Sequence, residues 1–446
     1  GEELRMKKTR LTAAACIVLA AVFLAGCAYA PDETTSAGPP TAGAVRFLNA
    51  RPEQDKQWRE LAKIYSRETG IPISVSTVAP GAYDEDLEIG LNKRDPLTLF
   101  EVSSPAALAR WKDRCYDLFG SELYASLSSD AYALKDGGAV LALPCGIASY
   151  GILVNQTLLG QAGDTADEIR SFSDLARIAE DITARREELG FAAFASTGAE
   201  GPDGQSYAAC LANLPLYYEL ADAGGTKAAL QGTYLPQLKA FWDLYAANAV
   251  YTGAQLRSRT IADAEEEMRR GEAVFFPGGT QEFSILTEDG GLAEGDLTIL
   301  PFYIGVGDEA SQGLCTGSEA YWCVNAGASE EDIQATLDFL TWCLGPETGA
   351  QALSGEADAM PSGNTGMGLA LPYRGTEPPS NPLVQAELDL TAAGKVPVGW
   401  AFSAMPGEDW ASGFGAALNA YAAGTDSWDS VVSAFVDGWA ALSDPG

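Results

Sequence analysis

The chain has 446 residues and a formal net charge of −33, from 61 acidic and 28 basic residues. This length allows two domains or more, and such an acidic surface repels nucleic acid and anionic lipid. The sequence contains no histidine, which removes the commonest general base, the usual serine and cysteine triads and most zinc sites. Nucleic-acid binding and histidine-dependent catalysis are therefore disfavoured.

The N-terminal segment has the parts of a secretory signal. A basic start at residues 6–10 precedes an apolar run over residues 11–24, which is too short to span a bilayer. The run ends in Leu-Ala-Gly-Cys at residues 24–27, which resembles the bacterial lipobox. We expect residues 1–27 to be a signal peptide and Cys27 to carry the lipid that anchors the chain to the outer face of the cell membrane. The alternative is an ordinary cleaved signal with an incidental cysteine.

Residues 28–43 are rich in Pro, Thr, Ser, Gly and Ala, and we expect a flexible tether there. From residue 44 strand and helix patterns alternate, which predicts an α/β protein with βαβ units. From residue 330 onward the pattern predicts helices almost throughout. The strands expected before that point lie at residues 45–49, 71–78, 97–102, 139–143, 152–155, 191–196, 273–276, 297–302 and 319–325. The helices expected between them lie at residues 53–69, 83–91, 105–111, 171–189, 206–220, 235–247 and 261–270, with an interruption of the helix at 206–220 by Pro215.

Six cysteines remain once the signal segment and Cys27 are set aside. Outside the cytoplasm an even number of thiols can pair, but a chain of this length needs no disulfides to build its core. Pairing and buried free thiols are therefore both open. The sequence lacks a CxxC spacing, so we expect no metal, and no motif indicates a cofactor. The six are Cys115, Cys145, Cys210, Cys315, Cys323 and Cys343.

Four segments carry a family resemblance when they are taken in order. They are Leu-Pro-Cys-Gly-Ile-Ala-Ser-Tyr-Gly-Ile-Leu-Val-Asn at 143–155, Ser-Phe-Ser-Asp-Leu at 171–175, Gly-Glu-Ala-Val-Phe-Phe-Pro-Gly-Gly-Thr at 271–280, and the strand at 320–325 with the helix at 330–343. Each is weak alone. In this order behind a lipobox, they resemble the family 1 extracellular solute-binding proteins, the group that contains maltose-binding protein.

The resemblance implies a periplasmic-binding-protein-like fold of type II, in which two α/β lobes are joined by a multi-crossing hinge and enclose a ligand cleft. Lobe 1 would comprise residues 44–147 plus about 314–350, and lobe 2 residues 148–313 plus about 351–446. The implied function is that of a substrate-binding lipoprotein of an ABC importer. It would capture a sugar or oligosaccharide by hinge closure and deliver it to the permease, as a monomer and without catalysis.

Other functions are compatible with the same residues. The acidic balance favours a cationic ligand, so a receptor for polyamines, amino-acid derivatives or peptides is one alternative. A sensor that presents its ligand to a membrane kinase is another. A secreted carbohydrate hydrolase would need a pair of carboxylates, and no motif singles out such a pair.

A sugar site needs aromatic platforms and short polar groups. By resemblance, Trp410 lies in the C-terminal segment where the family places a stacking aromatic, and Trp400 lies in a loop just before it. Tyr217 and Tyr218 resemble the aromatic position of the second lobe. Core packing is the alternative for the tryptophans and for one of the two tyrosines.

The segment Gly278-Gly279-Thr280 matches the family's ligand loop, where glycine lets a ligand approach the backbone and a helix start offers free N–H groups. A plain strand-to-helix turn is the alternative. Gln281 follows, at a place where sugar binders often carry Trp, which weakens the sugar assignment.

Further candidates follow two strands at their carboxyl ends, where open α/β sheets bind ligands. They are Asn49 and Arg51 after the first strand, and Glu101, Ser103 and Ser104 after the third. Helix capping by one of the two serines, and an ion pair between Arg51 and Glu53, are the alternatives.

Overall fold

A computed structural model describes residues 43–78, 82–223, 230–318, 320–345, 348–355, 360, 362–363 and 366–443. The expected signal peptide, Cys27 and the tether up to residue 42 lie outside the described residues. Residues from Ala42 onward form one compact unit. Within the described ranges, the structure shows no helix with the length and apolar character that a membrane span requires.

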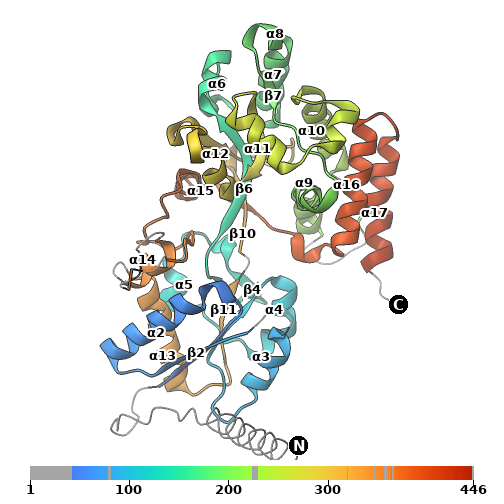
Figure 1. The fold of residues 1–446 in the computed structure, drawn as a ribbon. Helices are drawn as coiled ribbons and strands as arrows, with labels where there is room; N and C mark the ends of the chain where they lie inside the picture. Colours follow the sequence, from blue (N-terminus) through green and yellow to red (C-terminus); the bar gives the residue numbers. More distant parts are fainter. Residues whose placement is uncertain are drawn as a thin grey trace, which may run out of the picture. The chain divides into compact units, whose positions relative to one another are not determined.

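The first lobe is built on a six-stranded sheet in the order β2-β1-β3-β11-β5-β4 (Figure 1). Its strands are β1 (Val45–Asn49), β2 (Ile73–Thr77), β3 (Leu99–Val102), β4 (Leu134–Asp136), β5 (Ala139–Pro144) and β11 (Tyr321–Val324). Its helices are η1 (Pro52–Gln54), α2 (Asp55–Thr69), α3 (Tyr83–Leu91), α4 (Pro105–Trp111), η2 (Lys112–Arg114), α5 (Glu122–Ser126), η3 (Asp130–Tyr132), α13 (Glu330–Cys343) and α14 (Thr348–Ser354).

Strand β1 is parallel to β2 and β3, whereas β11 is antiparallel to β3 and β5. Neighbouring side chains of a strand point to opposite faces of the sheet. Phe47 accordingly packs in the same core as Trp58 of α2, while Leu48 packs with Leu87 of α3. Helices therefore cover both faces of this sheet.

The second lobe is built on a sheet in the order β12-β10-β6-β8-β7, and β9 also pairs with β6. Its strands are β6 (Ala148–Asn155), β7 (Ala192–Phe194), β8 (Ala273–Gly279), β9 (Leu297–Leu300), β10 (Gln312–Gly317) and β12 (Val396–Gly399). Its helices are α6 (Gln156–Ala162), η4 (Ala166–Glu168), α7 (Phe172–Ala184), α8 (Arg186–Leu189), α9 (Gly201–Asp222), α10 (Leu235–Asn248), η5 (Gly253–Ser258), α11 (Ile261–Arg269), η6 (Thr280–Glu282), α12 (Phe283–Thr287), η7 (Glu288–Gly290), η8 (Glu294–Asp296), η9 (Glu309–Ser311), α15 (Pro382–Ala392), η10 (Phe402–Ala404), α16 (Glu408–Ala422) and α17 (Trp428–Ser443).

Two separate cores flank the second sheet. Ile152 of β6 packs with residues of α7, α9, α10, α16 and α17, whereas the adjacent Leu153 packs with residues of α11 and α15. The last two helices, drawn in red, lie side by side in Figure 1 and pack on each other.

The chain passes between the sheets at residues 145–147, where β5 leads into β6, and near residue 318, where β10 leads into β11. A further passage follows Tyr373, which packs in the first-lobe core, and leads to α15, whose Leu383 packs with second-lobe residues while Val384 packs in the first-lobe core. The lobe boundaries expected from the sequence are corrected accordingly. Strand β10 pairs with β6 in the second lobe, and the buried residues between 350 and α15 that pack in the first-lobe core are Ala352, Leu353, Met360, Ala370, Leu371 and Tyr373. Apolar packing partners and strand pairing, which local patterns do not specify, fix these boundaries.

Several elements differ from expectation. Strands β4 and β10 were not expected, and three further differences concern the second lobe. The helix expected at 171–189 is broken at Arg185, which lies between α7 and α8. Helix α9 runs through Pro215 without ending, and Leu214 and Leu216 beside it are fully buried. Strand β12 lies in the C-terminal part, where helices were expected almost throughout. Residues of both α9 and β12 are buried in the larger core of the second lobe. This burial stabilises the helix despite Pro215 and the strand despite the helical pattern around it.

The six cysteines of the described chain all have free thiols. The sequence left both disulfide pairing and free thiols open, and the structure shows free thiols. Five of them are buried and Cys210 is half-buried.

Candidate ligand-binding site

A cavity of about 1050 Å³ is lined by residues of both lobes. Ligand sites for small molecules measure roughly 300–1,000 Å³, so this cavity has room for a ligand larger than a single small metabolite. The first lobe contributes η1, η3 and the segment after β3. The second lobe contributes β6, α9, the end of β8 and the segment after β12.

Aromatic side chains supply much of the cavity wall. The Tyr150 and Phe402 rings are stacked with centroids 6.2 Å apart, and the Trp400 centroid lies 5.2 Å from that of Phe402. Aromatic faces of this kind suit ligands with apolar C–H surfaces. The aromatic lining residues are Tyr132, Tyr150, Tyr207, Phe276, Phe302, Tyr321, Trp400 and Phe402.

Two contacts hold Trp400 in place. Its indole Nε1 donates a hydrogen bond of 3.1 Å to the carbonyl oxygen of Cys315. Its ring lies against Gly317, where an added Cβ would come within 2.3 Å of Trp400 Cδ2. The absence of a side chain at Gly317 is therefore what admits the ring.

The glycine segment lies at the end of β8. Gly278 and Gly279 pair with Gly151 and Tyr150 of β6, and both line the cavity. Helix η6 starts directly afterwards, as expected from the sequence. This arrangement brings backbone rather than bulky side chains to the cavity edge.

Arg51 and Glu282 are the formally charged residue types in the lining. Burial is the main cause that raises the pKa of Glu282 to about 8, and a hydrogen bond between its protonated carboxyl group and the Glu265 carboxylate adds to the shift. Burial also raises the pKa of the Cys210 thiol to about 12 and that of Cys145 well above its usual value. These groups are protonated at neutral pH, so the wall carries little charge for such an acidic chain.

Asn49 and Glu101 support the first-lobe wall from behind and do not line it. The Asn49 side chain donates to the Arg51 carbonyl at 2.8 Å and accepts from the Arg51 N–H at 3.1 Å. Glu101 accepts from the Ala50 N–H at 2.8 Å, and its other oxygen accepts from the Cys145 thiol at 3.5 Å. Both side chains are buried and hold the segment that presents Arg51.

The structure brings seven of the predicted residues together at the cavity: Arg51, Ser103, Ser104, Gly278, Gly279, Gln281 and Trp400. Ser104 also caps α4 by accepting from the Ala107 N–H at 3.1 Å, so capping and cavity lining coexist there.

The remaining four predicted residues lie elsewhere. Trp410 is corrected to a core residue, because it is 2% exposed and its ring contacts Phe414, Phe435 and Trp439. The other three do not line the cavity: Tyr217 and Tyr218 pack against the second core, and Thr280 is buried with its carbonyl bonded to Asn381.

Sequence reasoning missed most of the aromatic wall. Tyr150 and Cys145 stand inside the crossing segment 143–155, whose position between the lobes was a usable signal. Phe402 is two residues beyond Trp400, and Glu282 directly follows Gln281. Tyr132 and Tyr207 carry no local signal, because only the tertiary fold brings η3 and α9 to the cavity. Among the described residues, no group of three or more acidic or cysteine side chains is arranged to hold a metal ion.

Solved structures with the same architecture come from several bacteria. A family 1 extracellular solute-binding protein from Bifidobacterium longum subsp. infantis superposes with a TM-score of 0.62 at 15% identity, over 90% of this chain and 100% of that one. The cyclic α-maltosyl-1,6-maltose binding protein of Arthrobacter globiformis gives 0.60 at 15% identity, over 92% and 100%. A sugar transporter protein of Bacillus licheniformis in complex with stachyose gives 0.53 at 16% identity, over 90% and 100%.

The fold is therefore that of the two-lobe, maltose-binding-protein-like binding proteins of type II. The family model of the bacterial extracellular solute-binding proteins matches residues 60–379. The chain belongs to this family, whose members are extracytoplasmic receptors. No curated protein sequence matches the chain.

Proposed function

We propose that this protein is the substrate-binding lipoprotein of an ABC importer and that it captures a neutral sugar or oligosaccharide. The observation that carries the proposal is the cavity, whose aromatic and weakly charged wall is contributed by both lobes. A ligand that contacts both lobes stabilises the closed arrangement and shifts the equilibrium towards it. The permease would then receive the sugar from the closed form.

The structural neighbours support this assignment indirectly. The Arthrobacter globiformis protein binds a cyclic maltosyl-maltose, and the Bacillus licheniformis protein holds stachyose. The large cavity fits ligands of more than one sugar ring better than a single amino acid. We further propose that the protein acts by binding alone, as a monomer anchored through Cys27.

A thermal-shift screen tests the ligand class. We expect maltose, raffinose or stachyose to raise the melting temperature, because a ligand that binds only the native state stabilises it. Spermidine and the common amino acids form the comparison set, since they represent the cationic and amino-acid alternatives. A melting temperature raised by spermidine or an amino acid, and by none of the sugars, would contradict the proposal.

A second assay separates binding from catalysis. The sugar identified by the screen is incubated with the protein, and the solution is analysed by chromatography. We expect the sugar to be recovered intact. Cleavage products that disappear when one acidic residue is replaced would instead support the hydrolase alternative.

A further inference from the structure

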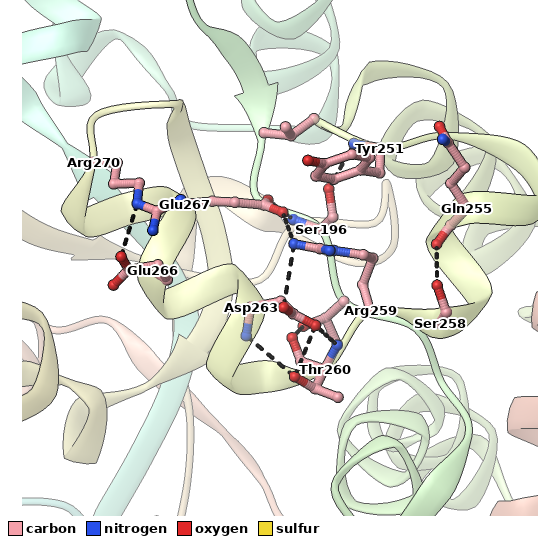
Figure 2. A network of polar contacts seen from close by, with 12 residues as sticks. Ser196, Tyr251, Gln255, Ser258, Arg259, Thr260, Asp263, Glu266, Glu267 and Arg270 are labelled. Atoms are coloured by element: carbon pink, nitrogen blue, oxygen red, sulfur yellow. Dashed lines mark hydrogen bonds and ion pairs between the residues drawn. The ribbon is translucent and has the colours of Figure 1, made fainter.

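Three consecutive glutamates on α11 have different partners, because successive residues of a helix point about 100° apart. Glu266 is paired with Arg270 at 2.8 Å, and Glu267 with Arg259 at 3.0 Å. Figure 2 shows both pairs, together with the 2.6 Å hydrogen bond from the Ser196 N–H to Glu267. Glu265, the first of the three, hydrogen-bonds the carboxyl group of Glu282.

The two carboxyl groups are in direct contact and buried, with Glu265 9% and Glu282 8% exposed. Glu282 belongs to η6, directly after the glycine segment, and it lines the cavity. A hydrogen bond between two carboxyl groups needs a proton on one of them, and two adjacent carboxylates in a buried site repel strongly. The contact is therefore stable while the pair holds at least one proton.

The groups around Glu282 offer no compensating charge in the described part of the chain. Gln281 donates its amide N–H to Glu282 at 3.2 Å, and α9 contributes the Cys210 thiol and the Tyr207 ring. Tyr150 of β6 donates its hydroxyl to the Cys210 carbonyl. No arginine or lysine is among the groups that shift the pKa of Glu282, and Arg259, beside α11, is engaged by Asp263 and Glu267.

We infer that the Glu265–Glu282 pair is a specificity-determining element, which keeps a proton and gives the cavity wall a hydrogen-bonding carboxyl group suited to uncharged hydroxyl-bearing ligands. This inference rests on the proposed function for the identity of the cavity as the ligand site. A cationic ligand would meet an uncharged carboxyl group of Glu282 at the wall and gain no ion pair with it, whereas a sugar hydroxyl can hydrogen-bond to that group as it stands.

The pair gives ligand binding a characteristic pH dependence. The pKa of Glu282 is raised to about 8, so the proton is present at pH 7 and about nine-tenths lost at pH 9. If the protonated pair is the binding-competent form, sugar affinity falls about tenfold between pH 7 and pH 9. Because the chain contains no histidine, few other side chains titrate in this window.

The first experiment tests, without any ligand, whether the Glu265–Glu282 pair holds a proton at pH 7. Infrared spectra at pH 7 of the wild type, Glu282→Gln and Glu266→Gln are compared in the carbonyl region of protonated carboxyl groups. We expect Glu282→Gln to lose a band that Glu266→Gln keeps, since Glu266 is exposed and paired with Arg270. Identical spectra for the two variants would overturn the inference. Glu265→Gln provides a second variant, in which the band should disappear at a lower pH than in the wild type.

The second experiment tests selectivity by titration calorimetry from pH 7 to pH 9, with maltose, raffinose and stachyose as neutral ligands and spermidine as the cationic one. We expect the affinity for the bound sugar to fall about tenfold in the wild type and in Glu266→Gln, but to stay level with pH in Glu282→Gln. A wild-type affinity that is level with pH, or sugar binding that releases a proton in buffers of different ionisation heat, would contradict the inference. If none of the sugars binds, the proposed function fails, and the infrared result alone decides whether the pair holds a proton.

Discussion

At the residue scale, Trp400 provides the most accessible test of the cavity. Replacing it with alanine removes a large aromatic surface from the wall, so we expect affinity for the sugar to fall about tenfold or more. Phe119→Ala is the matched control, because Phe119 is 63% exposed and does not line the cavity. Calorimetry at pH 7 measures both. Equal affinities for the two variants would mean that Trp400 does not contact the ligand.

Glu387 of α15 is a second buried carboxyl group with a measurable pH effect. It accepts a hydrogen bond of 2.6 Å from the Tyr132 hydroxyl of the first lobe, and burial is the main reason why its pKa is raised to about 7. The native state therefore binds a proton more tightly than the unfolded state. Its contribution to stability is complete below the unfolded-state pKa of about 4.5 and is lost as the pH rises through about 7.

We expect Glu387→Gln to reduce this loss, because the amide cannot ionise. Melting temperatures at pH 5 and pH 8 give the measurement, and exposed Glu88→Gln accounts for the general effect of removing one acidic residue from a highly acidic chain. A melting temperature that falls equally between these pH values in both variants would exclude Glu387 as the source.

Residue-level prediction from the sequence succeeded where a residue belongs to a motif. Gly278 and Gly279 were identified by the segment that contains them, and Arg51 by its place after a strand. Trp410 was misassigned because the sequence shows an aromatic residue at a helix start, but not that Phe435 and Trp439 of another helix cover it. The contact between Glu282 and Glu265 could not be predicted from the sequence either, because only the tertiary fold brings η6 close to α11.

At the element scale, β6 is the strand on which the second lobe depends. It pairs with β8 along one edge and with β9 and β10 along the other. At Gly151 an added Cβ would lie 2.1 Å from the carbonyl oxygen of Leu300, which belongs to the backbone of β9 and cannot move aside freely.

We expect Gly151→Ala to force β6 and β9 apart and to destabilise the protein by about 1–3 kcal/mol. Gly160→Ala in α6 is the control, because no atom lies within 4 Å of its added Cβ and alanine favours a helix. Thermal unfolding followed by circular dichroism compares the two. The structural argument fails if Gly151→Ala is as stable as the control.

The strands and helices of the first βαβ units were predictable because the apolar residues of each segment recur with the spacing of a strand or a helix. The elements β1, α2, β2, α3 and β3 all lie where this spacing predicted them. Strands β10 and β12 were not, because their short segments become strands through pairing with β6 and with each other. The lobe boundary after residue 350 was misplaced because residues such as Leu353 and Leu371 pack in the first-lobe core, and a local pattern does not specify the packing partner.

At the scale of the whole molecule, the proposed function requires the two lobes to close on the ligand. We expect small-angle X-ray scattering to show a smaller radius of gyration when the sugar identified in the screen is added. The same sugar at the same concentration should leave the Trp400→Ala variant unchanged if its affinity has fallen below that concentration. An unchanged radius in a wild type shown by calorimetry to be saturated would argue against hinge closure.

Membrane attachment is a separate whole-molecule prediction. In a bacterial host, the wild type should incorporate an alkyne-labelled fatty acid and fractionate with membranes. Cys27→Ser should do neither, because serine cannot carry the thioether-linked lipid. Label retained in Cys27→Ser would contradict lipidation at this residue, whereas a soluble wild type would favour an ordinary cleaved signal.

A crystal structure of the wild type with the sugar selected by the screen tests the central proposal most directly. The sugar should occupy the cavity, stack on Trp400 and contact Glu282 as well as first-lobe residues such as Arg51. A sugar bound outside the cavity, or held by one lobe alone, would contradict capture between the lobes.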